Sequence, residues 1–104
     1  MGPIEVRVPH HLEPAEVRRR LERGIERAQS DFGDRVSRID TAWRSDNELD
    51  VRVEVMGMTI TSDLTLEPEA IVVRLTLPGM ARLFAGKIRA GIEDKLGGLL
   101  AAPA

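Results

Sequence analysis

Alternating apolar and polar residues mark five segments of the chain as β-strands. The clearest is 49–55, where a leucine and three valines alternate with Asp50, Arg52 and Glu54. A period of two sends successive side chains to opposite faces of a sheet, so this strand has one apolar and one charged face. The same pattern, interrupted by proline, glycine and turn-forming residues, predicts further strands over 4–8, 37–44, 58–66 and 71–77.

Two other segments repeat their apolar residues every three or four positions, which is the spacing of one helix face. The first begins at Pro14, a favourable residue for the first turn of a helix, and is expected to stop at Gly33. Its apolar stripe consists of Val17, Leu21, Ile25, Ala28 and Phe32. The second helix is expected over 80–100, with a stripe of Phe84, Ile88, Ile92, Leu96 and Leu99.

The elements therefore follow one another in the order β-α-β-β-β-β-α. Strands with one apolar and one polar face are typical of an antiparallel sheet that is covered on its apolar side. We predict an α+β fold in which both helices pack on one face of the sheet. The pattern shows no linker or internal repeat, so residues 1–104 should form a single domain, with 101–104 as a frayed C-terminal tail.

Composition narrows the classes of function. The chain has 15 basic and 17 acidic residues and a net charge of −2, whereas domains that bind nucleic acid usually carry a strongly basic surface. Nucleic acid is therefore disfavoured as a partner. The sequence has no cysteine and no apolar stretch of the roughly 18 residues that a transmembrane segment needs. We expect a cytoplasmic protein without a membrane span.

The sequence shows no catalytic or metal-binding constellation. The histidines, His10 and His11, are neighbours in a predicted loop, where we expect them to be solvated, because a metal site needs several ligands at suitable spacing. Asp50 and Asp63 lie among arginines on the predicted solvent face of the sheet, a pattern that favours cross-strand ion pairs over acid–base catalysis. We predict a non-enzymatic protein with no catalytic residues, no cofactor and no metal.

Two surface features are candidates for contacts with a partner. The three arginines at 18–20 form a basic cluster, although nearby glutamates favour a solvated face of mixed charge. In the second helix, Gly86 and Ala90 share a face with Leu83, opposite the apolar stripe. This strip of small residues could accept another helix, but single exposed apolar residues are common, and the strip is also consistent with an ordinary surface.

Several short motifs, taken with the order of the elements, resemble a known family. The first strand ends in Pro9-His10, Leu77-Pro78-Gly79-Met80 leads into Phe84-Ala85-Gly86-Lys87-Ile88, and a final helical run covers 92–96. These features resemble the small bacterial polyhydroxyalkanoic acid system family, whose members have about this length and are encoded near polyester-granule genes. The resemblance implies a cytoplasmic setting and association with granules, and it supplies no catalytic residues.

A second likeness is to the ribosome hibernation factors, which share a β-α-β-β-β-α order. The run 32–36, Phe-Gly-Asp-Arg-Val, is similar to their helix-to-strand junction. This chain has one strand more and lacks their basic surface. Binding to ribosomal RNA needs many contacts with phosphates, so this resemblance ranks lower.

Three hypotheses for function follow. The first is an accessory protein that contacts a protein partner or a polyester granule through the start of the second helix: Met80, Leu83, Phe84, Gly86 and Lys87. The second is a binder of small apolar ligands, with a pocket between sheet and helix lined by Trp43, Met58 and Phe84. The third is an RNA-associated factor that uses the arginines at 18–20 with Arg82, Lys87 and Arg89. Homodimerisation is left open.

Overall fold

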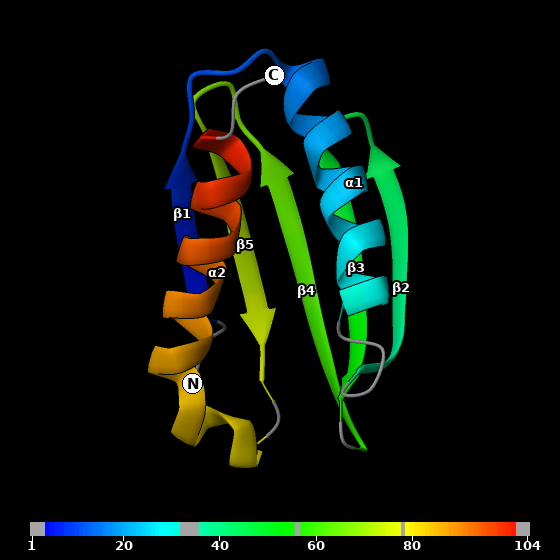
Figure 1. The fold of residues 1–104 in the computed structure, drawn as a ribbon. Coiled ribbons are helices and arrows are strands. Elements are labelled where there is room, and N and C mark those ends of the chain that lie inside the picture. The colour runs from blue at the N-terminus through cyan, green and yellow to red at the C-terminus, as the bar shows by residue number, and fades with distance from the viewer. Residues whose placement is uncertain (1–3, 32–35, 56, 78, 102–104) are drawn as a thin grey trace.

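The chain folds into one antiparallel sheet with helices on one side (Figure 1). The computed structural model describes residues 4–31, 36–55, 57–77 and 79–101. The strands are β1 (Ile4–Pro9), β2 (Val36–Ser45), β3 (Glu48–Val55), β4 (Met58–Leu66) and β5 (Ala70–Thr76), in the spatial order β1-β5-β4-β3-β2. The helical elements are α1 (Pro14–Asp31), the short 3₁₀ helix η1 (Gly79–Phe84) and α2 (Ala85–Ala101).

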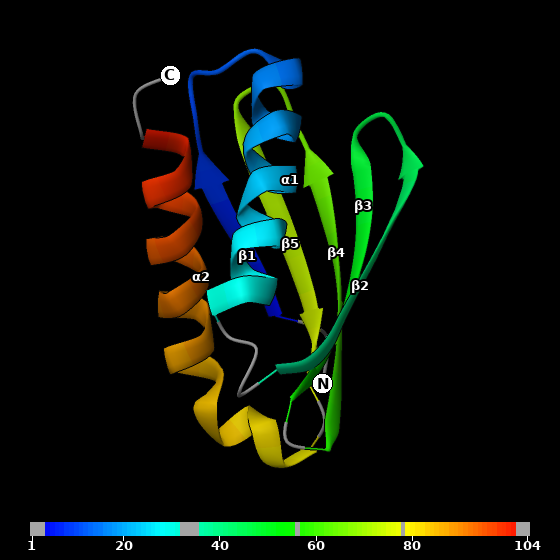
Figure 2. The same cartoon turned by 45° about the vertical axis from the view of Figure 1, so that its right-hand side comes forward.

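Both helices cover the same face of the sheet (Figures 1 and 2). Helix α2 packs on β1, and α1 packs against β2, β4 and α2. The predicted α+β fold, with its element order and its two helices on one face, is therefore confirmed. The four strands β2 to β5 form a meander, and β1 pairs with β5 at its other edge.

The alternation along the strands builds the core directly. Val6, Val73, Leu64 and Leu49 are aligned across β1, β5, β4 and β3, and all four are buried. They lie on the helix-covered face with Val17 of α1. Residues one position away along each strand point to the opposite face, where most of them are polar. The period of two in the sequence thus identifies the core face, although in β5 the intervening Val72 is buried as well.

Glycine and asparagine form the predicted turns between strands. Gly57 has a φ of 79°, in the left-handed region that favours glycine, and it reverses the chain from β3 to β4. The turn from β2 to β3 contains Asn47, whose carbonyl oxygen accepts a hydrogen bond of 2.8 Å from the backbone N–H of Leu66.

The second helix differs from the prediction. It begins as the 3₁₀ helix η1 and becomes α-helical only at Ala85. Its stripe is also less buried than expected, because Ile88 and Ile92 are half-buried and Leu100 is the one fully buried residue of α2. Phe84, the last residue of η1, is 57% exposed, so the predicted apolar stripe does not reach the core at this position.

Some predictions fall outside the described residues. These are the helix stop at Gly33, residues 32–35 of the junction, and residues 102–104 of the tail. Ala101, which was predicted to belong to the tail, is the last residue of α2. Among the helices that the structure describes, none is long and apolar enough to cross a membrane.

Candidate interaction surface

Two large apolar side chains lie exposed at one end of the molecule. Leu83 is 82% exposed and Phe84 is 57% exposed, and both belong to η1, which lies at the end of the molecule where α2 begins (Figures 1 and 2). Single exposed apolar residues are common on soluble proteins, but two adjacent large ones on a projecting turn form a patch. We call residues 82–89 the exposed tip.

Three cations lie within five residues of this apolar pair in the sequence. Arg82, Lys87 and Arg89 are all exposed, and none of them forms an ion pair with any residue that the structure describes. The sequence has no acidic residue between Glu69 and Glu93, although the whole chain has a net charge of −2. The exposed tip is therefore a local cationic region on a weakly acidic protein.

The exposed tip includes most of the residues that were predicted from the sequence to contact a partner. Leu83, Phe84, Gly86 and Lys87 are exposed there, and a Cβ atom added at Gly86 would meet nothing within 4 Å. Met80 belongs to η1, and its side chain lies outside the described part of the structure. Their role in binding stays a prediction, but the structure leaves this surface open to a partner.

Trp43 and Met58 do not lie near each other. Trp43 is in the same cross-strand row as Leu49 and Leu64, whereas Met58 stands at the beginning of β4, six residues before Leu64. At about 3.3 Å per residue, this places them roughly 20 Å apart along the strand direction. The two residues therefore cannot line one small pocket, as the ligand hypothesis required.

Trp43 instead takes part in a contact between sheet and helix. It is half-buried against the core, and the guanidinium carbon of Arg18 lies 4.1 Å from the centre of its ring. This is the geometry of a cation–π interaction. Arg18 also donates a hydrogen bond of 3.2 Å to Glu22, one turn further along α1.

The other two arginines of the basic cluster are engaged as well. Arg19 and Arg20 both donate hydrogen bonds to Glu16. These bonds, first that of Arg19 and then that of Arg20, hold the pKa of the Glu16 carboxyl below its usual value of 4.5. Arg20 is only 7% exposed, and its guanidinium also donates to the backbone carbonyls of Leu99 and Leu100, at 2.9 and 3.2 Å.

The expectation that Arg20 belongs to a solvated face is therefore wrong. The end of α2 lies beside α1, and its last carbonyl groups need donors, which Arg20 supplies from the neighbouring helix. The arginine cluster connects α1 to the end of α2 through Arg20 and to Trp43 through Arg18. It does not present three free cations to a nucleic acid.

The prediction for His10 is also wrong, whereas His11 is exposed as expected. His10 is 5% exposed and ties the segment before α1 to the turn between β4 and β5. Its Nδ1 atom accepts a hydrogen bond of 3.1 Å from the backbone N–H of Leu12, and its Nε2 lies 3.2 Å from the carbonyl oxygen of Glu67. A neutral imidazole with its proton on Nε2 satisfies both partners.

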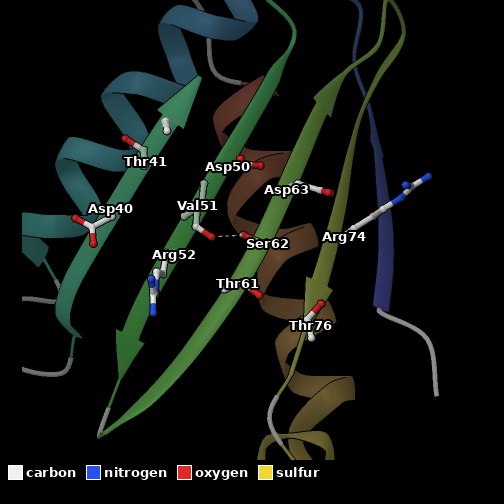
Figure 3. A pocket seen from close by; sticks show the side chains of 11 residues that line it. Asp40, Thr41, Asp50, Val51, Arg52, Thr61, Ser62, Asp63, Arg74 and Thr76 are labelled. Atoms are coloured by element: carbon white, nitrogen blue, oxygen red, sulfur yellow. Dashed lines mark hydrogen bonds between the residues drawn. The ribbon is translucent and has the colours of Figure 1, made fainter. Parts of the chain in front are cut away.

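A shallow depression of about 600 Å³ lies on the face of the sheet opposite the helices (Figure 3). Its lining includes Asp40, Asp50, Asp63, Arg52, Arg74, Thr61 and Thr76. Asp50 and Asp63 stand directly opposite each other on β3 and β4, and Arg44 lies 2.9 and 3.9 Å from their carboxylates. Ion pairs between strands are present on this face as predicted, but they are formed with Arg44 and with Glu5 of β1, which the prediction did not include.

The depression is a surface of balanced charge. Arg74 forms a further ion pair of 3.7 Å with Glu5 of the neighbouring strand β1. The side chains of Asp50 and Asp63 are 48% and 40% exposed, so both are in contact with solvent. The outer face is consistent with a solvated sheet held by ion pairs.

The chain was compared with known proteins. The family described as "Putative polyhydroxyalkanoic acid system protein" matches residues 4–100, which include every strand and nearly all of α2. No curated protein and no solved structure matches the chain. The family resemblance in the sequence is thereby confirmed, and the chain belongs to the polyhydroxyalkanoic acid system protein family.

Proposed function

We propose that this protein is a non-enzymatic accessory protein of polyhydroxyalkanoate metabolism, and that it attaches to polyester granules through its exposed tip. Family membership supports the setting. The observation that carries the mode of action is the exposure of Leu83 and Phe84 on a projecting turn. Large apolar side chains in such a position gain free energy when an apolar surface removes them from water.

The shape of the exposed tip favours a surface over an enclosed ligand. Sites for small molecules are concave and bury most of the ligand, whereas η1 lies at one end of the molecule, with Leu83 and Phe84 exposed to solvent (Figure 2). Burial of one Leu or Phe side chain contributes up to about 1.5–3 kcal/mol. Two partly exposed side chains therefore support a weak, reversible attachment of each molecule, which suits a protein that covers a large particle.

The two other hypotheses lack such an observation. The ligand hypothesis needed Trp43 and Met58 in one pocket, and the strand register separates them. The RNA hypothesis relied partly on the arginines at 18–20, which contact Trp43, Glu16, Glu22 and the end of α2.

Sedimentation with polyester granules stripped of their proteins tests the proposal. The wild-type chain should pellet with the granules, and the double variant Leu83→Ser, Phe84→Ser should remain in the supernatant. The matched control is Leu83→Met, Phe84→Leu, which keeps the exposed tip apolar and should still pellet. Because both residues are largely exposed, neither double variant should change stability by more than about 1 kcal/mol.

Two results would count against the proposal. The first is a serine variant that is folded and pellets as well as the wild type. The second is pelleting that occurs only with granules that retain their proteins, which would replace the granule surface by a protein partner.

A further inference from the structure

The cations of the exposed tip indicate which charge its partner carries, which the apolar residues do not. We infer that the exposed tip binds anionic lipid headgroups, with Leu83 and Phe84 entering the apolar layer and Arg82, Lys87 and Arg89 meeting the charged surface. This inference rests on the proposed function, because it uses the same tip and names the chemistry of the surface that it meets.

The positions of the cations support this assignment. Arg82 precedes Leu83 directly, and Lys87 follows Phe84 by three residues, so that cations flank the apolar pair in the sequence on both sides. Several other surface arginines have acidic partners, for example Arg44 with Asp50 at 2.9 Å, whereas Arg23, Arg27 and Arg52 have no ion pair with a described residue but lie apart from exposed large apolar side chains. The three tip cations have no such partner in the part of the chain that the structure describes.

Interfacial segments of proteins combine the same two components. They bury large apolar side chains at the boundary of headgroups and acyl chains, and they place Lys and Arg beside the headgroups. An anionic leaflet attracts each such cation by an amount that corresponds to roughly a fivefold gain in affinity, so three cations give roughly a hundredfold gain. An uncharged polyester surface would not attract these three cations in the same way.

The charge of the rest of the molecule sets the orientation. The region between Glu69 and Glu93 has no acidic residue, whereas the whole chain is net negative by two charges. An anionic surface therefore attracts the exposed tip and repels the remainder of the protein. The molecule would approach the lipid with the end that carries η1 (Figures 1 and 2).

A nucleic acid or an acidic protein fits this surface less well. Contacts with phosphates gain nothing from a leucine that is 82% exposed between the cations. A single phenylalanine also offers little to a strand of bases, which usually stack on several rings. A lipid interface is the partner that uses both the apolar and the cationic groups.

Co-sedimentation of the full chain with lipid vesicles tests the inference. Vesicles of phosphatidylcholine alone are compared with vesicles that also contain phosphatidylglycerol. The wild type should bind the mixed vesicles, should bind neutral vesicles far less, and should be released by salt. The triple variant Arg82→Gln, Lys87→Gln, Arg89→Gln should lose roughly a hundredfold in affinity.

A matched variant controls for the overall change in charge. Arg23→Gln, Arg27→Gln, Arg52→Gln removes three exposed cations from α1 and from the outer face of the sheet, and it should retain most of the binding. Leu83→Ser, Phe84→Ser should weaken binding to vesicles but should not change binding to heparin, a polyanion without an apolar layer.

Three outcomes would overturn the inference. These are equal binding to both kinds of vesicle, full binding by the glutamine variant of the tip, or binding to heparin that exceeds binding to anionic vesicles. The granule assay separates this inference from the proposed function. Binding to stripped granules without binding to vesicles removes only the lipid assignment, and binding to vesicles without any binding to granules removes only the granule function.

Discussion

Arg20 offers a sharp test of how the two helices are held together. It is only 7% exposed, and its guanidinium connects Glu16 on its own helix to the last carbonyl groups of α2. We predict that Arg20→Ala destabilises the protein far more than Arg19→Ala does. The comparison is well matched, because both side chains belong to α1 and both bind the same carboxylate.

The size of the difference follows from burial and from the partners that are lost. The Arg19 side chain is 46% exposed and its ion pair is a surface pair, so its removal should cost no more than about 1 kcal/mol. The Arg20 side chain is 9% exposed and donates two hydrogen bonds to carbonyls, each a charge-assisted bond of about 1.5–3 kcal/mol. Water can reach the end of α2 after truncation, which returns part of this, so we expect a loss of about 2–4 kcal/mol.

Urea denaturation followed by circular dichroism measures both losses. For a domain of this size, 1 kcal/mol corresponds to a shift of about 4–8 °C in Tm, so Arg20→Ala should melt at least about 10 °C below the wild type. Arg20→Met keeps the apolar stem without the donors and should be intermediate. Equal effects of Arg20→Ala and Arg19→Ala would refute the reasoning, and so would Arg20→Met with full wild-type stability.

Three further predictions concern single contacts. Because its arginine partners lower its pKa, Glu16 contributes stability that is complete above pH 4.5 and is lost as the pH falls through the lowered value; Glu16→Gln should therefore show a smaller loss of stability during acid titration. Gly91→Ala should stabilise the protein by about 1 kcal/mol in thermal melts, because a Cβ there meets nothing within 4 Å. Gly24→Ala should stabilise it less or not at all, because the added Cβ would lie 3.3 Å from a methyl group of Leu99 in α2. His10→Ala should cost about 1–3 kcal/mol in urea denaturation, since it leaves a backbone donor and a backbone acceptor unpaired, and the same change at the exposed His11 should be nearly neutral.

The fold could be predicted because its main signals are local. Each strand carries its own period of two, as Leu49 and Val51 alternate with Asp50 and Arg52, and in the structure Leu49 is buried whereas Arg52 is exposed. The turn at Gly57 is likewise encoded by the residue that sits in it. The break between η1 and α2 was missed because Phe84 continues the apolar spacing of the helix even though the core does not reach it.

The roles of individual polar residues could not be predicted, because they depend on contacts between distant segments. All three arginines at 18–20 have glutamates at helical spacing, and nothing local shows that Arg20 faces the end of α2. His10 is buried by a turn that lies more than fifty residues later. The separation of Trp43 from Met58 is a property of strand register, which the apolar pattern alone does not specify.

The pairing of β1 with β5 joins the beginning of the fold to its end. Ile4 lies opposite Leu75, so this pair can form only after the intervening three strands and one helix of the chain have been made. Pairings of such long sequence separation form slowly, and until then the edge of β5, with its run of buried aliphatic residues, is open to association with other chains. Helix α2 rests on β1, so the element that positions the projecting turn η1 would settle last during synthesis.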